Sequence, residues 1–360
     1  MDWKKYLIWI TGIIVGLLAI ILRYYGNPPN MGFCIACFER DIAGALGMHR
    51  ANVVQYIRPE IIGIVLGAFI AAIIHKEFRP QGGSSPATRF ILAILVMIGA
   101  LIFLGCPLRM VIRLGGGDLN ALVALLGFIA GIWIGVIFLK KGFSFKRAVK
   151  VTKLDGWILP SIMIILFLLL IFAPIFNKEI DGPIFFSKEG PGSKHAPIFL
   201  SIIGGLLVGY FAQRSRMCFV GGIRDFFLIR ETYLLKAFIT IFFVVLIGNL
   251  LLGSFKFGFI EQPVAHNQHI WNFLGMSLVG LGHVLLGGCP LRQLIIAGTG
   301  NSDSTLTVLG MIIGAGIAHN FMLAASPKGV SIYGKIVVIL GLIITILIGF
   351  LNQEKNIKNA

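Results

Sequence analysis

The chain has 360 residues, of which 57% are hydrophobic and 13% charged, with a mean hydropathy of +0.91 and a formal net charge of +16. Apolar runs near the ~20 residues that cross a bilayer recur along it, which excludes a soluble core, and they do not alternate as barrel strands would. The basic excess suits cytoplasmic loops better than a nucleic-acid surface, because no basic soluble face is visible. We therefore predict an all-α, polytopic membrane protein.

Ten apolar segments follow one another along the chain. They lie at roughly 6–25, 59–75, 87–105, 119–140, 157–176, 197–212, 232–252, 270–287, 304–325 and 333–351. The first is too long for the core of a signal peptide and no small-residue cleavage site follows it, so we expect an uncleaved span. A polar stretch separates the fifth and sixth segments. It predicts a first membrane repeat at 1–177, a linker at 178–196 and a second membrane repeat at 197–360.

The two halves repeat two motifs. Gly-Cys-Pro-Leu-Arg stands at 105–109 and again at 288–292. A cysteine followed at the same spacing by Arg-Asp begins at Cys34 in one half and at Cys218 in the other. Five spans per half is an odd number, so the second half would cross the membrane in the opposite orientation to the first. The two halves would form an inverted repeat, an arrangement common in transporters. An even number of spans would make the repeat parallel.

Loop charge predicts the orientation. The segment 140–153 carries six Lys and Arg residues, and 214–236 carries five. Because Lys and Arg concentrate on the cytoplasmic side, we expect both termini to be cytoplasmic. The cysteines Cys34 and Cys106 would then approach from outside and Cys218 and Cys289 from the cytoplasm, as a line of thiols through the protein.

The proline after Cys106 and after Cys289 predicts a helix that begins there. Each cysteine would be an N-cap, with free backbone N–H groups and the positive end of the helix dipole beside its sulfur, an environment that attracts anions. Arg109 and Arg292 lie three residues further on and can share the faces of these cysteines. For one copy, an inert buried cysteine is an equal alternative. Two copies in matching context favour a binding site.

A short re-entrant helix is predicted around 31–41, where apolar residues mix with Arg40 and Asp41. Ionisable groups at membrane depth are costly and usually line a pathway or pair with one another. We expect Arg40 with Asp41, and Arg224 with Asp225, to be structural pairs that support the re-entrant elements.

Cys34 and Cys37 also form a C-x-x-C, which permits a redox function. Cys37 corresponds to Gly221 in the second half, so the dithiol is not repeated. The alternative function is a membrane thiol-disulfide oxidoreductase that uses Cys34 and Cys37 with another cysteine pair. The sequence shows no close Cys/His cluster and no nucleotide motif, so we expect no catalytic residues, cofactor or metal.

The cysteine motif at Cys34, both Cys-Pro-Leu-Arg motifs and the tail at 116–118 resemble the YeeE/YedE sulfur-transport family, most closely its YedE branch, which is associated with selenium metabolism. The resemblance implies an inner-membrane permease with inverted pseudo-symmetry, not an enzyme. In the YeeE branch it implies uptake of thiosulfate by relay between cysteines, here Cys34, Cys106 and Cys289. Cys218 joins them through the internal repeat.

The expected substrate is thus a small sulfur- or selenium-containing anion, thiosulfate-like or a selenium species. Besides the lipid bilayer, a cytoplasmic sulfur-carrier protein is a candidate partner, and no nucleic acid is expected.

Overall fold

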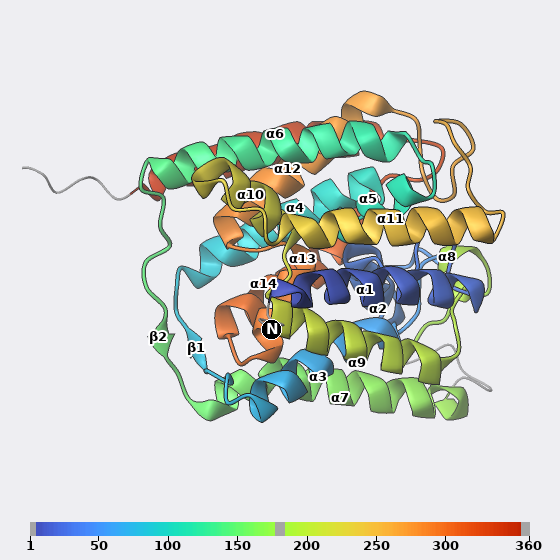
Figure 1. The fold of residues 1–360 in the computed structure, drawn as a ribbon, viewed down its shortest axis with the longest axis horizontal. Helices are drawn as coiled ribbons and strands as arrows, with labels where there is room; N and C mark the ends of the chain where they lie inside the picture. Colours follow the sequence, from blue (N-terminus) through green and yellow to red (C-terminus); the bar gives the residue numbers. More distant parts are fainter. Residues whose placement is uncertain (1–4, 177–183, 354–360) are drawn as a thin grey trace, which may run out of the picture.

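The computed structural model describes residues 5–176 and 184–353, and its regular structure is almost entirely helical, as predicted. In chain order the elements are α1 (Leu7–Tyr24), α2 (Ile35–Ala45), α3 (Pro59–Ile74), β1 (Gln81–Gly82), α4 (Pro86–Phe103), α5 (Pro107–Gly115), α6 (Asn120–Lys140), β2 (Val149–Lys150), α7 (Lys153–Phe176), α8 (Gly190–Ser193), α9 (Ile198–Ser215), α10 (Phe219–Ile229), α11 (Leu235–Leu251), α12 (His269–Leu286), α13 (Pro290–Gly298), α14 (Ser302–Asn320) and α15 (Ile332–Leu351). The strands β1 and β2 pair antiparallel at one end of the molecule (Figure 1).

Each of the ten predicted apolar segments lies on one helix. These helices are α1, α3, α4, α6, α7, α9, α11, α12, α14 and α15. Within the described ranges, seven helical stretches are long and apolar enough to cross a membrane: α1, α4 with α5, α6, α7, α9 with α10, α12 with α13, and α15. The apolar helices α3 and α11 are shorter. The predicted polytopic helical fold is confirmed.

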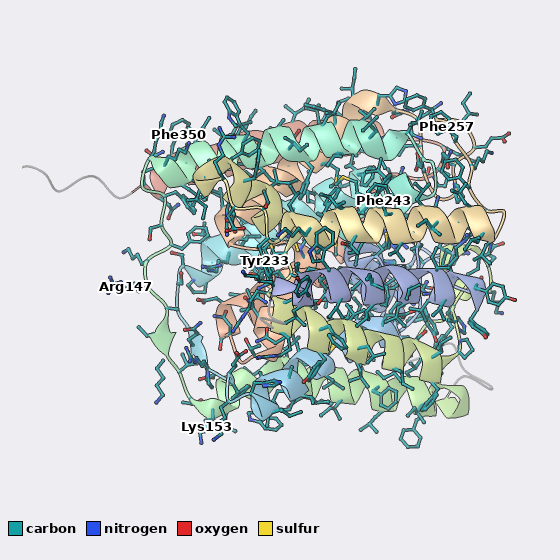
Figure 2. The ribbon with its side chains drawn as sticks, in the orientation of Figure 1. Arg147, Lys153, Tyr233, Phe243, Phe257 and Phe350 are labelled. Atoms are coloured by element: carbon teal, nitrogen blue, oxygen red, sulfur yellow. The ribbon has the colours of Figure 1, made fainter. Side chains whose placement is uncertain are left out.

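Apolar side chains are exposed along the outer helices, and charged side chains project at the end that bears β2 (Figure 2). Phe243 on α11 and Phe350 on α15 are 53% and 54% exposed. Arg147 and Lys153 are exposed at the end that bears β2. A broad exposed apolar surface is what a lipid environment requires, since such surface is unfavourable in water.

The helices of the two halves correspond in order, α1–α7 to α9–α15, and they pack across the halves in reciprocal pairs. The contact of α3 with α9 is matched by that of α11 with α1, and α6 with α12 by α14 with α4. Likewise, α5 packs on α11 and α13 packs on α3. The final helices differ, because α7 packs on α3 whereas α15 packs on α12 and α4. The halves are therefore interleaved, with most contacts made between them.

Glycines allow these helices to approach closely. A Cβ on Gly63 or Gly67 of α3 would collide with backbone atoms of α9, and one on Gly127 or Gly131 of α6 with backbone atoms of α12. Small residues at helix contacts are the usual means of close packing in membranes.

Two long helices are broken at the repeated motif. Leu104 ends α4 with φ 60° and Gly287 ends α12 with φ 85°, both in the left-handed region. A new helix then begins with proline, with Cys106 as N-cap of α5 and Cys289 as N-cap of α13, as predicted. Cys34 and Cys218 are the N-caps of α2 and α10. Because α2 packs on α13 and α10 on α5, the four short helices meet in the interior.

Candidate functional site

The first thiol cluster consists of Cys34, Cys37 and Cys106, which are buried, free thiols. The sulfur of Cys34 accepts a hydrogen bond from the backbone N–H of Cys37 at 3.2 Å. The sulfur of Cys106 accepts one from the N–H of Ile35, also at 3.2 Å. The N-terminal end of α2 therefore donates to the N-cap cysteines of both α2 and α5, and two helix dipoles point their positive ends at this cluster.

Arg109 is fully buried beside the first thiol cluster. Its guanidinium donates to the sulfur of Cys37 at 3.7 Å and to the carbonyls of Leu104, Asn30 and Val264. The sequence predicted that Arg109 shares the face of Cys106, and the structure directs its guanidinium to Cys37. None of its hydrogen-bond or ion-pair partners in the described residues is a carboxylate. An uncompensated buried charge is unfavourable, so Arg109 provides a strong attraction for an anion.

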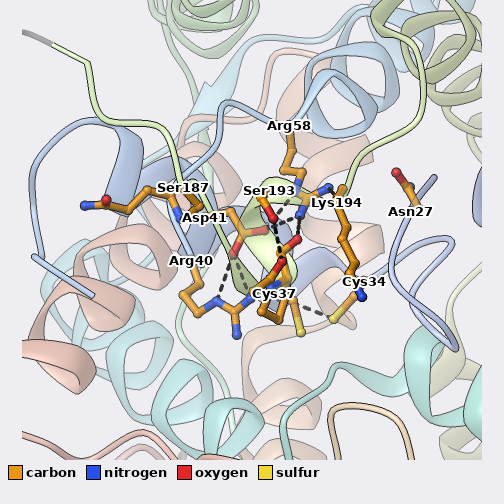
Figure 3. Close-up of polar contacts among 12 residues, drawn as sticks. Asn27, Cys34, Cys37, Arg40, Asp41, Arg58, Ser187, Ser193 and Lys194 are labelled. Carbon is orange, nitrogen blue, oxygen red and sulfur yellow. Dashed lines mark hydrogen bonds and ion pairs between the residues drawn. The ribbon is translucent and has the colours of Figure 1, made fainter. Parts of the chain in front are cut away.

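Arg40 and Asp41 form the expected pair, with a third residue that sequence reasoning missed. Arg40 and Arg58 each lie 2.7 Å from Asp41, and all three side chains are buried (Figure 3). Arg58 also donates to the carbonyls of Pro191 and Lys194, which fastens the segment before α9 to the first half. Arg58 lies outside the repeated motif; the available signal was an arginine directly before the proline that begins α3.

The Gly-Gly-Asp tail after α5 has a structural role in this chain. Arg113 pairs with Asp118 at 2.7 Å and donates to the carbonyl of Phe103 at 2.8 Å. Asp118 in turn accepts from the backbone N–H of Asn120. These bonds join the end of α4, the helix α5 and the start of α6, and they fix the broken helix that carries Cys106.

The second thiol cluster consists of Cys218 and Cys289. The sulfur of Cys218 accepts from the N–H groups of Gly221 at 3.2 Å and Cys289 at 3.4 Å. Arg292 is partly buried, and its guanidinium reaches the side-chain oxygen of Gln213 at 3.5 Å. Gly221 occupies the place that Cys37 has in the first cluster, as the repeat predicted.

The pair Arg224 and Asp225 is present at 2.7 Å, but it is 26% and 22% exposed. It therefore braces α10 near solvent, whereas its counterpart Arg40–Asp41 is enclosed.

Two cavities adjoin the arginines of the clusters, one through residues that bind Arg109 and the other through Arg292 itself. A cavity of about 570 Å³ is lined by Arg40, Leu104 and Val264, two of which contribute carbonyls to Arg109, and by Pro191 of α8. A second cavity of about 320 Å³ is lined by Glu77, Arg79, Gln81 of β1, Arg216, Arg292, Ile296 and Thr299. Figure 1 shows α8 and β1 at opposite ends of the molecule, so the cavities open at opposite ends.

This arrangement suits an oxygen-bearing soft anion. Thiols meet its sulfur or selenium, while helix N–H groups and guanidinium groups meet its oxygens. Within residues 5–176 and 184–353, no group of three or more His, Cys, Asp and Glu side chains is placed to hold a metal ion.

Comparison with known proteins agrees with this chemistry. The thiosulfate transporter TsuA of Spirochaeta thermophila is 29% identical over 118 residues, which is 33% of this chain and 35% of that protein. TsuA of Escherichia coli is 26% identical over 116 residues, 32% of each chain. An uncharacterised protein of Methanocaldococcus jannaschii is 32% identical over 93 residues, 22% of this chain and 88% of that protein. The alignments thus span about a third of the length of the two transporters.

A family model described as "Sulphur transport" matches residues 3–106 and 214–352, more than half of the chain. The match contains all four motif cysteines, Cys34, Cys106, Cys218 and Cys289, so the chain belongs to this sulphur transport family, the family of the YeeE and YedE proteins.

Proposed function

We propose that the chain is an inner-membrane permease that takes up a small sulfur- or selenium-containing anion, such as thiosulfate or a selenium oxyanion, by relay along four cysteines. The observation that supports it most is that two cavities at opposite ends adjoin the two arginines. One cavity is lined by Leu104 and Val264, whose carbonyls accept from Arg109, and the other is lined by Arg292. Membership in a sulphur transport family and the helical membrane fold agree with transport rather than catalysis.

In this relay the anion enters through the larger cavity and reaches Cys34 and Cys106 beside Arg109. It then passes to Cys289 and Cys218 beside Arg292 and leaves through the smaller cavity. No bond to sulfur forms or breaks, because each thiol only donates an S–H hydrogen bond and each guanidinium holds oxygens. The contacts of α2 with α13 and of α10 with α5 support a short transfer between the clusters. The arginines of the smaller cavity are a suitable place for a cytoplasmic sulfur-carrier protein to collect the anion.

Uptake measurements test this function. Cells without other uptake routes should accumulate labelled thiosulfate or selenite when they express the wild-type chain. They should not do so with the Cys106→Ser, Cys289→Ser double variant at the same protein level in the membrane. Equal accumulation by the double variant would reduce these cysteines to packing residues and remove the relay. The ratio of thiosulfate to selenite uptake identifies the substrate.

The proposal includes ten crossings, an inverted repeat and cytoplasmic termini. The reciprocal helix packing supports the repeat, and the basic segment 140–153 supports the orientation. Accessible cysteine reporters near Lys146 and near Lys188 should therefore label from opposite sides, with Lys146 cytoplasmic. Labelling of both from one side would contradict the five-plus-five arrangement.

A further inference from the structure

Glu39 is a buried carboxyl group that the anion relay does not use. It lies on α2, and its exposed fraction is 0%. Neither of its oxygens has a hydrogen-bond partner in the part of the chain that the structure describes. An ionised carboxylate without partners in such a place is strongly unfavourable, so the group is neutral in this conformation.

The helices that pack against α2 carry other titratable groups, and each of these has a contact of its own, although Glu60 Oε2 and His319 Nε2 have no hydrogen-bond partner among the described residues. Titratable groups on the helices that pack against α2 are Glu60 on α3, Arg89 on α4, Arg292 on α13, and Asp303 and His319 on α14. Glu60 accepts from Asn27 and Ser201, Arg89 donates to Ser84, Arg292 reaches Gln213, Asp303 accepts from Gly83, and His319 stacks on His49. Glu39 is therefore available to take up and release a proton without breaking an existing bond.

The repeat shows that packing does not require a carboxyl at this position. Cys34 and Cys37 correspond to Cys218 and Gly221 in the repeat. By the same spacing, Ile223 is the residue of the second half that corresponds to Glu39. Ile223 is buried on α10 as Glu39 is on α2. The same re-entrant helix is thus built once with an apolar side chain and once with an acid, which is the expected pattern for a functional group rather than a structural one.

The charge of the first thiol cluster links Glu39 to the anion. Arg40 and Arg58 share the single carboxylate Asp41, and Arg109 is bound by carbonyls, which leaves an excess of two positive charges. A divalent anion cancels this excess. Once the anion has moved on, a negative charge nearby is favourable again, and a conformation that opens Glu39 to the inner side lets it ionise and supply that charge. Glu39 follows Cys37 by two residues, a rotation of about 200° around the helix axis. It therefore lies on the side of α2 opposite Cys37 and does not obstruct the anion.

We propose that Glu39 is the proton site of a proton-coupled permease: it takes a proton from the outer side as the anion enters and releases it to the inner side after the anion has left the first cluster. This inference rests on the proposed transport function. Linkage requires that the proton favour anion binding as much as the anion favours protonation. Each co-imported proton also cancels one of the anion's two charges, which lowers the work of moving it against an inside-negative membrane potential.

Purified protein in liposomes tests the coupling. With a pH-sensitive dye inside, equal pH on both sides and the membrane potential clamped by potassium and valinomycin, labelled thiosulfate should enter wild-type liposomes with about one proton per anion. In the Glu39→Gln variant, thiosulfate should still enter down its own gradient, while acidification falls to the level of protein-free liposomes. The matched control is Glu60→Gln, which alters a buried carboxyl whose Oε1 accepts from Asn27 and Ser201, and it should keep the wild-type proton flux.

The outcomes separate the two proposals. Thiosulfate uptake by the wild type without acidification, or full acidification with Glu39→Gln, overturns the proton coupling and leaves the transport function intact. No uptake of thiosulfate or selenite by the wild type overturns the transport function, and the coupling with it. A second readout does not depend on transport: the infrared band of a protonated carboxyl should be present in the wild type with thiosulfate and absent in Glu39→Gln. An identical spectrum for the two proteins also overturns the inference.

Discussion

The two thiol clusters use the same motif with different degrees of restraint. In the first, the buried Arg109 is held by backbone carbonyls of three separate segments. In the second, the partly buried Arg292 is held by the side chain of Gln213, which itself donates to Glu77. Backbone carbonyls are fixed by the fold, whereas side chains change rotamer readily. The comparison indicates a rigid cluster at one end of the proposed relay and an adjustable one at the other.

The two helix breaks show the same contrast. The first break places Leu104 in the left-handed region, which is strained for a residue with a side chain, whereas the second uses Gly287 at no such cost. The strained carbonyl of Leu104 accepts from both Arg109 and Cys37. The surrounding contacts thus enforce one geometry around the first cluster and leave the second freer.

The largest effect should come from the two motif cysteines, where the clusters are expected to behave alike. Serine keeps the size and a donor but loses the polarisable sulfur that would contact the soft atom of the anion. Cys106→Ser and Cys289→Ser should each reduce thiosulfate uptake to background, and Cys34→Ser should impair it strongly. Uptake at matched amounts of inserted protein measures this. Loss with only one of Cys106→Ser and Cys289→Ser would show that a single cluster carries the substrate.

Arg109→Ala should produce the next largest loss. It removes the buried cation from the first cluster, and it leaves four carbonyl groups without this donor. Anion uptake should fall far more than with Lys146→Ala, which removes an exposed cation outside both clusters. Normal insertion together with normal uptake by Arg109→Ala would make this arginine idle in transport.

Glu77→Gln should slow release at the adjustable cluster. Glu77 lies 3.0 Å from Arg214 and 3.1 Å from Arg216, at the smaller cavity that contains Arg292. Its carboxylate competes with a transported anion for these guanidinium groups. Its neutralisation should tighten thiosulfate binding at the inner face by about tenfold, the effect of about 1.4 kcal/mol, and lower the maximal uptake rate.

Binding to inside-out vesicles and uptake velocity measure this effect. Glu261→Gln is the control, because Glu261 is an exposed carboxylate paired with Lys256 outside both cavities. Unchanged inner-face affinity with Glu77→Gln would contradict the idea that the second cluster is regulated by its side-chain partners.

Stability should separate the two Arg–Asp pairs. Arg58→Ala leaves Asp41 with one partner in a buried site and frees the segment that holds Pro191, so the expected cost is about 3–5 kcal/mol. Arg224→Ala breaks a partly exposed pair, and solvent screening limits its cost to about 0–1 kcal/mol. Thermal unfolding in detergent should show a clearly lower midpoint for Arg58→Ala than for Arg224→Ala. Equal midpoints would mean that burial does not distinguish the two pairs.

Sequence reasoning predicted the parts of this fold that depend on local pattern. Apolar length located the helices, and proline after Cys106 and Cys289 located the helix starts, because both signals are written within a few residues. The spacing of the repeat also predicted that Cys37 and Gly221 occupy equivalent positions. These features required no knowledge of which helices touch.

Features that depend on distant contacts could not be predicted. Arg58 is 17 residues from Asp41, and Gln213 is 79 residues from Arg292, so neither pairing has a local signal. The direction of the Arg109 guanidinium depends on carbonyls of Asn30 and Val264, which the interleaving of the halves brings together. The interleaved packing of the halves could not be predicted either, because an internal sequence repeat does not indicate whether helices pack within one half or between the halves.

The smallest effect should come from Cys37, and it distinguishes a permease from an oxidoreductase. Cys37 accepts from Arg109 and lies next to Cys34, yet its counterpart Gly221 has no side chain. A relay that works in the second cluster without a third thiol should also tolerate Cys37→Ser, whose hydroxyl still accepts from Arg109. Uptake should therefore remain close to wild type, and a dithiol–disulfide assay should show no activity in either protein. An oxidoreductase that uses Cys34 and Cys37 would lose its activity with this single change, because serine cannot form a disulfide; that result would favour redox chemistry over transport and end the equivalence of the two clusters.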